Sequence, residues 1–264
     1  MPKTPISYYG GKQNMLRHIL PNIPEHRIYT EAFFGGGAVF FAKEPAESEI
    51  INDLNAQVMN LYYVCKTDFE KLKNKGEATV FARSTYSVAM AMYKVPHLFN
   101  QIQQAWAFYV ATNMGFGCRI GSWGMDKYGK RVKAFINKKM NFDESIPKRL
   151  ERTQIETGNA IQVIKQYDTS DTFHYIDPPY IETNMGHYQG YSISEYKELL
   201  NNLTEIKGRF LLSGFPNDIL DEFIHKNGWF VLGYNQPKTA SKATLGKPRL
   251  ARKTEVLVAN YELQ

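Results

Sequence analysis

An acidic residue, two prolines and a tyrosine follow an apolar run in the segment HYIDPPYIET, residues 174–183. Asp177 supplies carboxylate oxygens, which accept hydrogen bonds but donate none when the acid is ionised. Pro178 and Pro179 have a fixed φ and no backbone N–H, so the Pro178 carbonyl is a further acceptor without a competing donor. Tyr180 offers a flat face for stacking. Together these residues suit a planar ring that carries an NH₂ group.

The chemistry that this arrangement favours is the activation of a ring amine as a nucleophile. Such an amine is weak by itself because its lone pair is delocalised into the ring. Two acceptors on its hydrogens favour a pyramidal nitrogen, and they stabilise the positive charge that develops in the transition state. The nitrogen could then attack a sulfonium methyl in line, with positioning as the main contribution. Neither Cys65 nor Cys118 is assigned as a nucleophile.

A second candidate site is the run of three glycines, Gly35 to Gly37, between an expected strand and a helix. A turn without side chains lets a ligand lie against the backbone. It is not the dinucleotide fingerprint, since Phe40 stands where a third glycine is needed. Asp53, at the end of the next strand, is placed to accept hydrogen bonds from two ribose hydroxyls. These residues predict a nucleoside cofactor without pyrophosphate; a turn needed only for packing and a helix-capping Asp53 are the alternative.

The elements that must position these residues follow a βα pattern. A strand, a turn and a helix are predicted by RIYTEAFFGGGAVFFAKE, and SEIINDLNAQVMNLYYVC repeats the plan. Such units build a mostly parallel sheet, whose buried strands explain the apolar run TFHYID. A further strand and helix are predicted by RFLLSGF and NDILDEFIHKNG, and an antiparallel hairpin by WFVLGYN and EVLVANY. Ser213 lacks the context of a nucleophile elbow and is predicted to pack near the cofactor.

Residues 67–150 interrupt the βα pattern. A helical stretch rich in methionine and aromatic residues comes first and is consistent with core packing. The segment GFGCRIGSWGMDKYGKRVKAF then combines glycines, aromatic residues and bases without a clear period. We therefore predict an inserted domain over residues 67–150, and one α/β catalytic domain that binds the cofactor, made of residues 1–66 and 151–264.

Positive charge is concentrated in two segments of this chain, whose net charge is +6. The segment from Arg119 to Arg152 has ten Lys/Arg and four Asp/Glu, and that from Asn235 to Thr254 has six Lys/Arg and no acid. Two basic patches on an otherwise acidic body predict binding to the phosphates of a polyanion. Solvated basic loops are the alternative.

Membrane, secreted and metal-binding classes find no support in the sequence. No apolar run approaches the ~20 residues of a membrane span, and the N-terminus has no apolar region typical of a secretory signal. The two cysteines lie far apart and the six histidines are scattered, so no metal site is expected. This cysteine usage suits the reducing cytoplasm.

Four motifs in this order resemble the Dam-type adenine-specific DNA methyltransferases: PISYYGGK (5–12), EAFFGGG (31–37), IND (51–53) and DPPY (177–180). The resemblance covers the chain end to end, and the insertion falls where that family has its target-recognition domain. It implies a Rossmann-like methyltransferase fold, with a mostly parallel seven-stranded sheet that ends in an antiparallel hairpin. It also implies a monomeric, cytoplasmic protein of bacterial or phage origin.

The resemblance implies S-adenosylmethionine as the methyl donor, S-adenosylhomocysteine as the product and no metal. The acceptor would be an adenine that is extruded from double-stranded DNA. The implied catalytic residues are Asp177, Pro178, Pro179 and Tyr180. The implied cofactor-binding residues are Tyr8, Lys12, Phe34, Gly35, Gly36, Gly37, Asp53, Asn159 and Asp177.

The candidate DNA-binding residues are the basic residues of the two positive segments: Arg119, Lys130, Arg131, Lys133, Arg249, Arg252 and Lys253. Arg119 is a candidate for a bidentate contact with guanine, and a phosphate contact is its alternative. The segment around it aligns poorly with the family, so recognition of GATC is not carried over.

Other functions remain open at the level of sequence. The same chemistry could act on cytosine, on RNA or on a protein glutamine, although the basic insertion argues against protein. A DNA-binding protein without turnover could use the same scaffold, but the intact Gly35, Asp53 and Asp177 argue against it.

Overall fold

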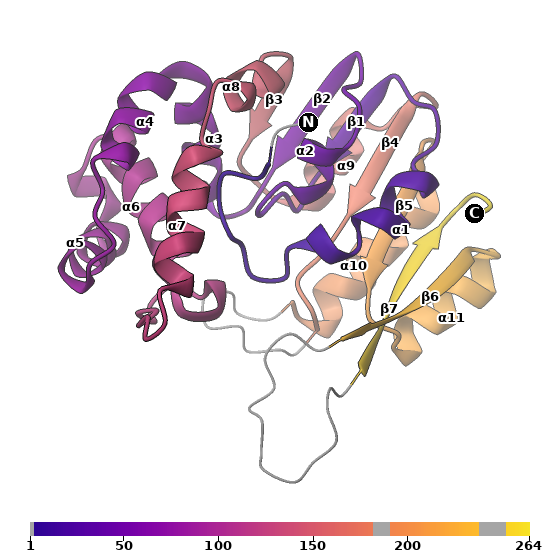
Figure 1. Cartoon of the computed structure of the whole chain (residues 1–264). Coiled ribbons are helices and arrows are strands. Elements are labelled where there is room, and N and C mark those ends of the chain that lie inside the picture. Colours follow the sequence, from indigo (N-terminus) through magenta and orange to yellow (C-terminus); the bar gives the residue numbers. More distant parts are fainter. Residues whose placement is uncertain (1–2, 182–190, 238–251) are drawn as a thin grey trace, which may run out of the picture.

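A seven-stranded sheet forms the centre of the computed structural model, which describes residues 3–181, 191–237 and 252–264 (Figure 1). The strands follow the order β3-β2-β1-β4-β5-β7-β6. Their bounds are β1 Ile28–Glu31, β2 Ser48–Asn52, β3 Thr153–Glu156, β4 Thr172–Ile176, β5 Arg209–Gly214, β6 Phe230–Pro237 and β7 Arg252–Ala259. Strands β1 to β5 pair in parallel, whereas β7 is antiparallel to both β5 and β6. This architecture confirms the predicted Rossmann-like sheet with an antiparallel hairpin at its end.

The strand order reverses beside β1, and this reversal positions the site. The chain runs outward from β1 through β2 to β3 and then returns to β4 on the other side of β1. In the register of the sheet, Glu31 of β1 lies opposite Ile51 of β2 and Tyr175 of β4. The loops that follow these three strands therefore emerge at one edge, where open α/β sheets bind their ligands.

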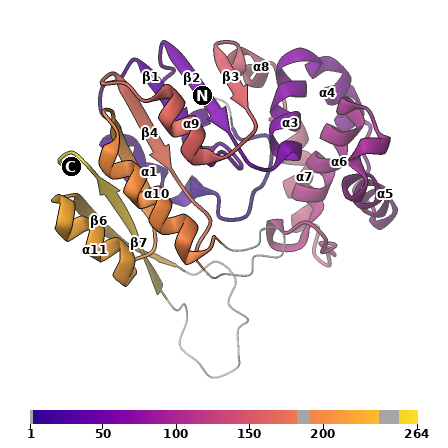
Figure 2. The same ribbon diagram turned by 180° about the vertical axis from the view of Figure 1, so that it is seen from behind.

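Helices cover both faces of the sheet. The helices α9 (Ala160–Tyr167), α10 (Ile193–Glu205) and α11 (Asp218–Asn227) lie on the face shown in Figure 2, while α1 (Leu16–Ile19) and α2 (Ala38–Ala42) lie on the other. Local signals set several of the helix ends. Asn217 caps the start of α11, and Gly228 ends it with a left-handed φ of 63°, as the sequence predicts.

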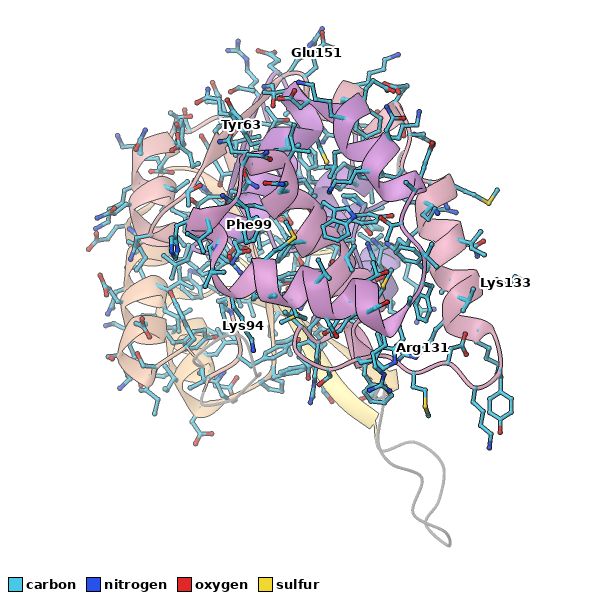
Figure 3. All side chains as sticks on the ribbon, turned by 90° about the vertical axis from the view of Figure 1, so that its left-hand side faces the viewer. Tyr63, Lys94, Phe99, Arg131, Lys133 and Glu151 are labelled. Atoms are coloured by element: carbon cyan, nitrogen blue, oxygen red, sulfur yellow. The ribbon has the colours of Figure 1, made fainter. Side chains whose placement is uncertain are left out.

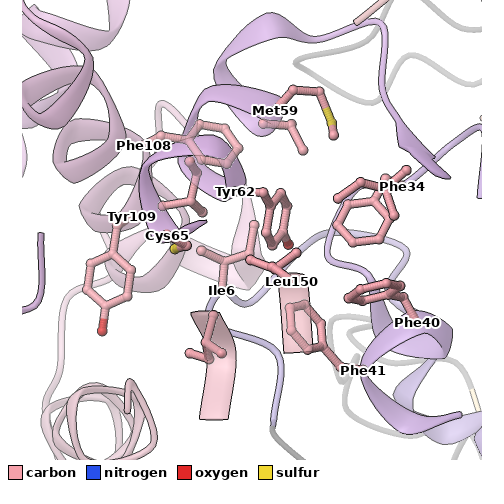
Figure 4. Packing of buried hydrophobic residues seen from close by; sticks show 14 of the residues in the cluster. Ile6, Phe34, Phe40, Phe41, Met59, Tyr62, Cys65, Phe108, Tyr109 and Leu150 are labelled. Carbon is pink, nitrogen blue, oxygen red and sulfur yellow. The ribbon is translucent and has the colours of Figure 1, made fainter. Parts of the chain in front are cut away.

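The chain between β2 and β3 is mostly helical. It contains α3 (Ala56–Thr67), α4 (Phe69–Glu77), α5 (Arg83–Lys94), α6 (Gln101–Met114), α7 (Lys130–Met140) and α8 (Ser145–Leu150). Helix α6 is buried on nearly all sides, and its Phe108 and Tyr109 belong to the same hydrophobic cluster as Phe34 and Tyr62 (Figure 4). One core thus runs from the sheet into these helices, and the proposed domain boundaries at 66/67 and 150/151 stay a prediction.

A buried ionic cluster fastens α8 to the region of the glycine turn. Glu49 of β2 accepts a hydrogen bond of 2.6 Å from Lys43, and it also pairs with Arg149 of α8. The Arg149 guanidinium donates to the carbonyl of Phe40 at 2.8 Å and stacks 3.6 Å from the Phe40 ring centre. Burial lowers the pKa of Lys43, and Glu49 opposes that shift. Loss of one partner would leave a buried unpaired charge, which typically costs about 3–5 kcal/mol.

No helix in the described part of the chain is both long enough and apolar enough to cross a bilayer.

Candidate active site

A cavity opens at the carboxyl ends of β1, β2 and β4, where the loops from the strand reversal meet. It brings together all but one of the residues predicted for catalysis and cofactor binding. These are Tyr8, Lys12, Phe34, Gly35, Gly36, Gly37, Asp53, Asp177, Pro178, Pro179 and Tyr180. The insertion contributes Thr112, Cys118 and Ile120 to the wall. Tyr191, just before α10, and Glu195, in its first turn, also line it.

The glycine turn is required by the protein's own aromatic side chains. Gly35 and Gly37 have φ values of 47° and 63°, in the region that favours glycine. A Cβ on Gly35 would lie 2.8 Å from the Tyr8 ring, and one on Gly37 would lie 2.5 Å from the Phe34 ring. The turn therefore serves close packing and lines the cavity at the same time.

Asp53 fixes the turn from the neighbouring strand. It is 6% exposed; its Oδ2 accepts from the Gly35 N–H at 2.8 Å and its Oδ1 from the Asn55 N–H at 2.9 Å. Burial raises the pKa of Asp53 to about 6, against the effect of these hydrogen bonds. The helix-capping alternative is wrong, because the Asn55 side chain caps α3. A carboxylate has about four acceptor positions, so Asp53 can still accept hydroxyl groups from a ligand.

In the loop after β4, one carboxylate oxygen of Asp177 accepts hydrogen bonds from side chains in the described part of the chain, and the other does not. Its Oδ1 accepts from the Lys12 ammonium at 2.7 Å and from the Ser213 hydroxyl at 3.1 Å. Within the described residues no hydrogen bond is made to Oδ2. Burial raises the pKa of Asp177, while Lys12 opposes the shift. The carboxylate is thus oriented by two donors and keeps one oxygen for a ligand.

Lys12 joins three parts of the chain at the floor of the cavity. It is 5% exposed, and besides Asp177 its Nζ lies 3.1 Å from Glu255 Oε1 and donates to the Tyr180 hydroxyl at 3.4 Å. Burial acts to lower the pKa of Lys12, but Asp177 and the other nearby acids outweigh it and raise the pKa well above its usual value. Lys12 is therefore a permanent cation.

Tyr180 belongs to an aromatic pair beyond the carboxyl end of β4. Its ring centre lies 4.1 Å from that of Phe215, with 33° between the planes. Burial raises the pKa of Tyr180 to about 12, so the hydroxyl stays protonated. The ring is consequently a neutral, firmly placed surface beside Asp177.

Several residues of the site escaped the sequence analysis. Glu255 directly precedes the apolar run VLVA in β7. An acid next to a buried strand is usually paired or functional, so this position was a signal in the sequence. Tyr175 lies two residues before Asp177, and its hydroxyl pairs with Ser213 at 3.0 Å. Glu31 lines the cavity, and burial raises its pKa to about 8. Ser213, predicted only to pack, donates directly to Asp177.

Asn159 is the predicted cofactor residue that the cavity does not include. Its side chain accepts hydrogen bonds from the backbone of Ile161 and Gln162, and so caps α9. The sequence contains the corresponding signal, an asparagine directly before an apolar helix.

The predicted DNA-binding residues have different surroundings. Arg119 is exposed, and its guanidinium lies 5.1 Å from the ring centre of Tyr9 at the cavity wall. Lys130 and Lys133 are exposed on α7, the helix on which Figure 3 labels Arg131 and Lys133. Arg131 is half-buried; it donates to the Gly115 carbonyl at 3.2 Å and lies 4.9 Å from the Phe116 ring centre.

Three further candidates belong to the second basic segment. Arg249 lies outside the described residues, and of Arg252 and Lys253 only the backbone is described, at the start of β7. Within residues 3–181, 191–237 and 252–264, no group of His, Cys, Asp or Glu could hold a metal ion.

Comparison with known proteins places the chain in one family. The family model of the D12 class N6 adenine-specific DNA methyltransferases matches residues 8–225. The type II methyltransferase M1.LlaDCHI of Lactococcus lactis is 26% identical, over 96% of this chain and 93% of that protein. The type II methyltransferase M.MjaIII of Methanocaldococcus jannaschii is 25% identical, over 97% and 98%. The modification methylase StsI of Streptococcus sanguinis is 24% identical, over 98% of this chain and 43% of that protein. The chain belongs to the D12 class N6 adenine-specific DNA methyltransferase family.

Proposed function

We propose that this chain transfers the methyl group of S-adenosylmethionine to the exocyclic amino group of an adenine flipped out of duplex DNA. The observation that carries the proposal is that the Asp177–Tyr180 corner and the glycine turn line one cavity. Asp177 keeps Oδ2 for a ligand there, while Oδ1 is held by Lys12 and Ser213.

The charge of the cavity supports this cofactor. Four acidic side chains, Glu31, Asp53, Asp177 and Glu195, line it, and Lys12 is already engaged by acids. Burial raises the pKa of Glu31 to about 8, so the negative charge of the cavity comes from the other three. An acceptor-rich cavity favours a ligand with hydroxyl groups and positive charge, and it disfavours phosphates. S-adenosylmethionine, when bound, supplies an electrophilic methyl on a positively charged sulfur. Asp53 would accept the ribose hydroxyls, and Phe34 with the glycine turn would lie against the methionine part.

Asp177 and Pro178 would bind the target amine directly. Asp177 Oδ2 and the Pro178 carbonyl accept its two N–H groups, and Tyr180 stacks on the base. Both acceptors stabilise the positive charge on nitrogen in the transition state; removal of one comparable preorganised group costs about 10²–10³ in rate. Asp177 would also take up the proton that the methylated amine must release.

Residues 67–150 would form the target-recognition domain. Lys130 and Lys133, together with Arg249, Arg252 and Lys253, are the proposed phosphate contacts. Arg119 adjoins the cavity wall through Tyr9, which supports a contact close to the extruded base. An unaltered methylation motif in the Arg119→Ala variant would assign this residue to phosphate instead.

The test is transfer of a radiolabelled methyl group to duplex DNA, followed by digestion to nucleosides. Wild type should label adenine, and Asp177→Ala should lose the activity while it binds S-adenosylmethionine with little change. Asp221→Ala, an exposed change on α11, is the matched control. Equal incorporation by wild type and Asp177→Ala would refute the mechanism. Label on cytosine, RNA or protein would change the substrate, and DNA binding without any incorporation would indicate a silent scaffold.

A further inference from the structure

We propose that Glu255 is a positioning residue for the methyl transfer, which holds the Lys12 ammonium between two carboxylates and thereby orients and charges Asp177. The inference rests on the function proposed above and extends it to strand β7. Glu255 lies far from the DPPY motif in sequence, and it is 8% exposed in the fold.

The Lys12 ammonium connects Glu255 with Asp177. An ammonium group has three N–H donors. Three oxygen atoms surround Nζ: Asp177 Oδ1 at 2.7 Å, the Tyr180 hydroxyl at 3.4 Å, and Glu255 Oε1, which forms a buried ion pair at 3.1 Å without a hydrogen bond. Two of these belong to the catalytic corner, and the third fixes the ammonium to the sheet.

The position of Glu255 in the sheet connects it with the other donor to Asp177. Strand β7 pairs with β5, so that Ser213 lies opposite Leu257 and Gly214 opposite Val256. The strand that supplies Glu255 therefore lies beside the strand that supplies Ser213, the other donor to Asp177 Oδ1. The two donors to Asp177 Oδ1, Lys12 and Ser213, are thus connected to one pair of adjacent strands, and Asp177 lines the cavity.

Glu255 also changes the net charge beside the target amine. Two ionised carboxylates share one ammonium, so the group bears one net negative charge. When a neutral amine attacks a sulfonium methyl, positive charge moves from sulfur towards the amine nitrogen next to Asp177. A net negative group stabilises that charge more than the neutral Lys12–Asp177 pair that would remain without Glu255.

The experiment compares single-turnover methyl transfer to duplex DNA in wild type and in Glu255→Gln, which keeps the size and an acceptor oxygen but removes the charge. We expect the rate constant to fall about 10- to 100-fold, with the Kd for S-adenosylmethionine unchanged within about twofold and Tm nearly unchanged. Glu222→Gln, an exposed substitution on α11, should transfer at the wild-type rate.

A second variant tests whether Glu255 acts through Lys12. In a Lys12→Met background, the Glu255→Gln change should bring no further loss of rate, because the two residues work as a unit. Multiplied losses would overturn the role assigned to the pair. A wild-type rate in Glu255→Gln would also overturn it, as would a rate loss matched by lost cofactor affinity or lost folding. If wild type itself transfers no methyl to DNA, the proposed function fails, which is a distinct result.

Discussion

Two regions border the same cavity and are held in opposite ways. The catalytic corner, residues 177–180, is secured by the buried Lys12, by Ser213 and by the ring of Phe215. The turn of residues 115–124, which we propose for target recognition and call the recognition turn, is closed by the Gly115–Trp123 bridge. It exposes 60% of Phe116 together with Arg119.

The backbone of the two regions shows the same contrast. In the recognition turn Gly117 and Cys118 both have a φ of 61°, which strains a residue other than glycine by about 1–2 kcal/mol. In the catalytic corner the two prolines fix the backbone without such strain. In the proposed function, chemistry would depend on a buried arrangement fixed by several contacts, whereas recognition would depend on an exposed turn, in which we expect substitutions to change binding more than folding.

The largest expected difference compares Gly37→Ala with Gly129→Ala. Both glycines have positive φ, at 63° and 71°, but only at Gly37 would the new Cβ meet a ring, that of Phe34 at 2.5 Å. Gly129→Ala should cost only the strain of about 1–2 kcal/mol, whereas Gly37→Ala should add about 1–3 kcal/mol of overpacking and abolish measurable cofactor binding. Thermal unfolding and calorimetric titration with S-adenosylmethionine measure both; equal losses would show that the clash is irrelevant.

A smaller effect is expected from Tyr180 at the catalytic corner. Base stacking on an aromatic ring is worth about 1–3 kcal/mol, so Tyr180→Ala should slow single-turnover transfer about 10- to 100-fold. Tyr180→Phe keeps the ring, loses only the hydroxyl that accepts from Lys12, and should stay within about threefold of wild type. If both variants slow the reaction equally, the hydroxyl rather than the stacking surface matters.

The pH dependence of cofactor binding should be smaller again. Burial raises the pKa of Asp53 to about 6, so the group takes up a proton as the pH falls through 6. In the proposed complex the ribose hydroxyls would donate to the ionised form of Asp53. The Kd should therefore be flat above pH 7 and rise up to about tenfold per pH unit below 6. The Asp53→Asn variant should bind more weakly and without this dependence. A persistent acid limb in that variant would assign it to another group.

The smallest effect is expected on the outer surface of α7. Lys133→Ala should weaken binding to all duplexes alike and reduce the slope of log K against log salt by about 1, since one phosphate contact is lost. Lys165→Ala, an exposed substitution on α9, is the control and should leave the slope unchanged. A shift in sequence preference with an unchanged slope would place Lys133 at a base instead.

Much of the fold was predictable because its signals are local. Apolar runs separated by helical periods predict βα units, and the corner, the glycine turn and Asp53 each follow a strand. Parallel strands bring such loops to one edge. The meeting of these residues in one cavity follows from that topology and needs no side-chain detail.

The parts that the sequence did not reveal depend on distant contacts. Glu255 reaches Lys12 only because β7 inserts between β5 and β6, which no local pattern specifies. Arg131 has the same charge as Lys130 and Lys133, but its guanidinium is engaged by the Gly115 carbonyl and Phe116. Charge patterns indicate a basic surface, yet they do not separate a cation that faces solvent from one that fastens a turn.

The continuous packing between α3 and α6 limits how this enzyme could evolve to recognise a different DNA sequence. Tyr62 and Cys65 of α3 share one hydrophobic cluster with Phe108 and Tyr109 of α6. If recombination replaced the helical region as a block, the new side chains would have to pack against α3 as well as the present aromatic rings do. Divergence in target choice is therefore expected to proceed by single substitutions at the outer loops rather than by module exchange.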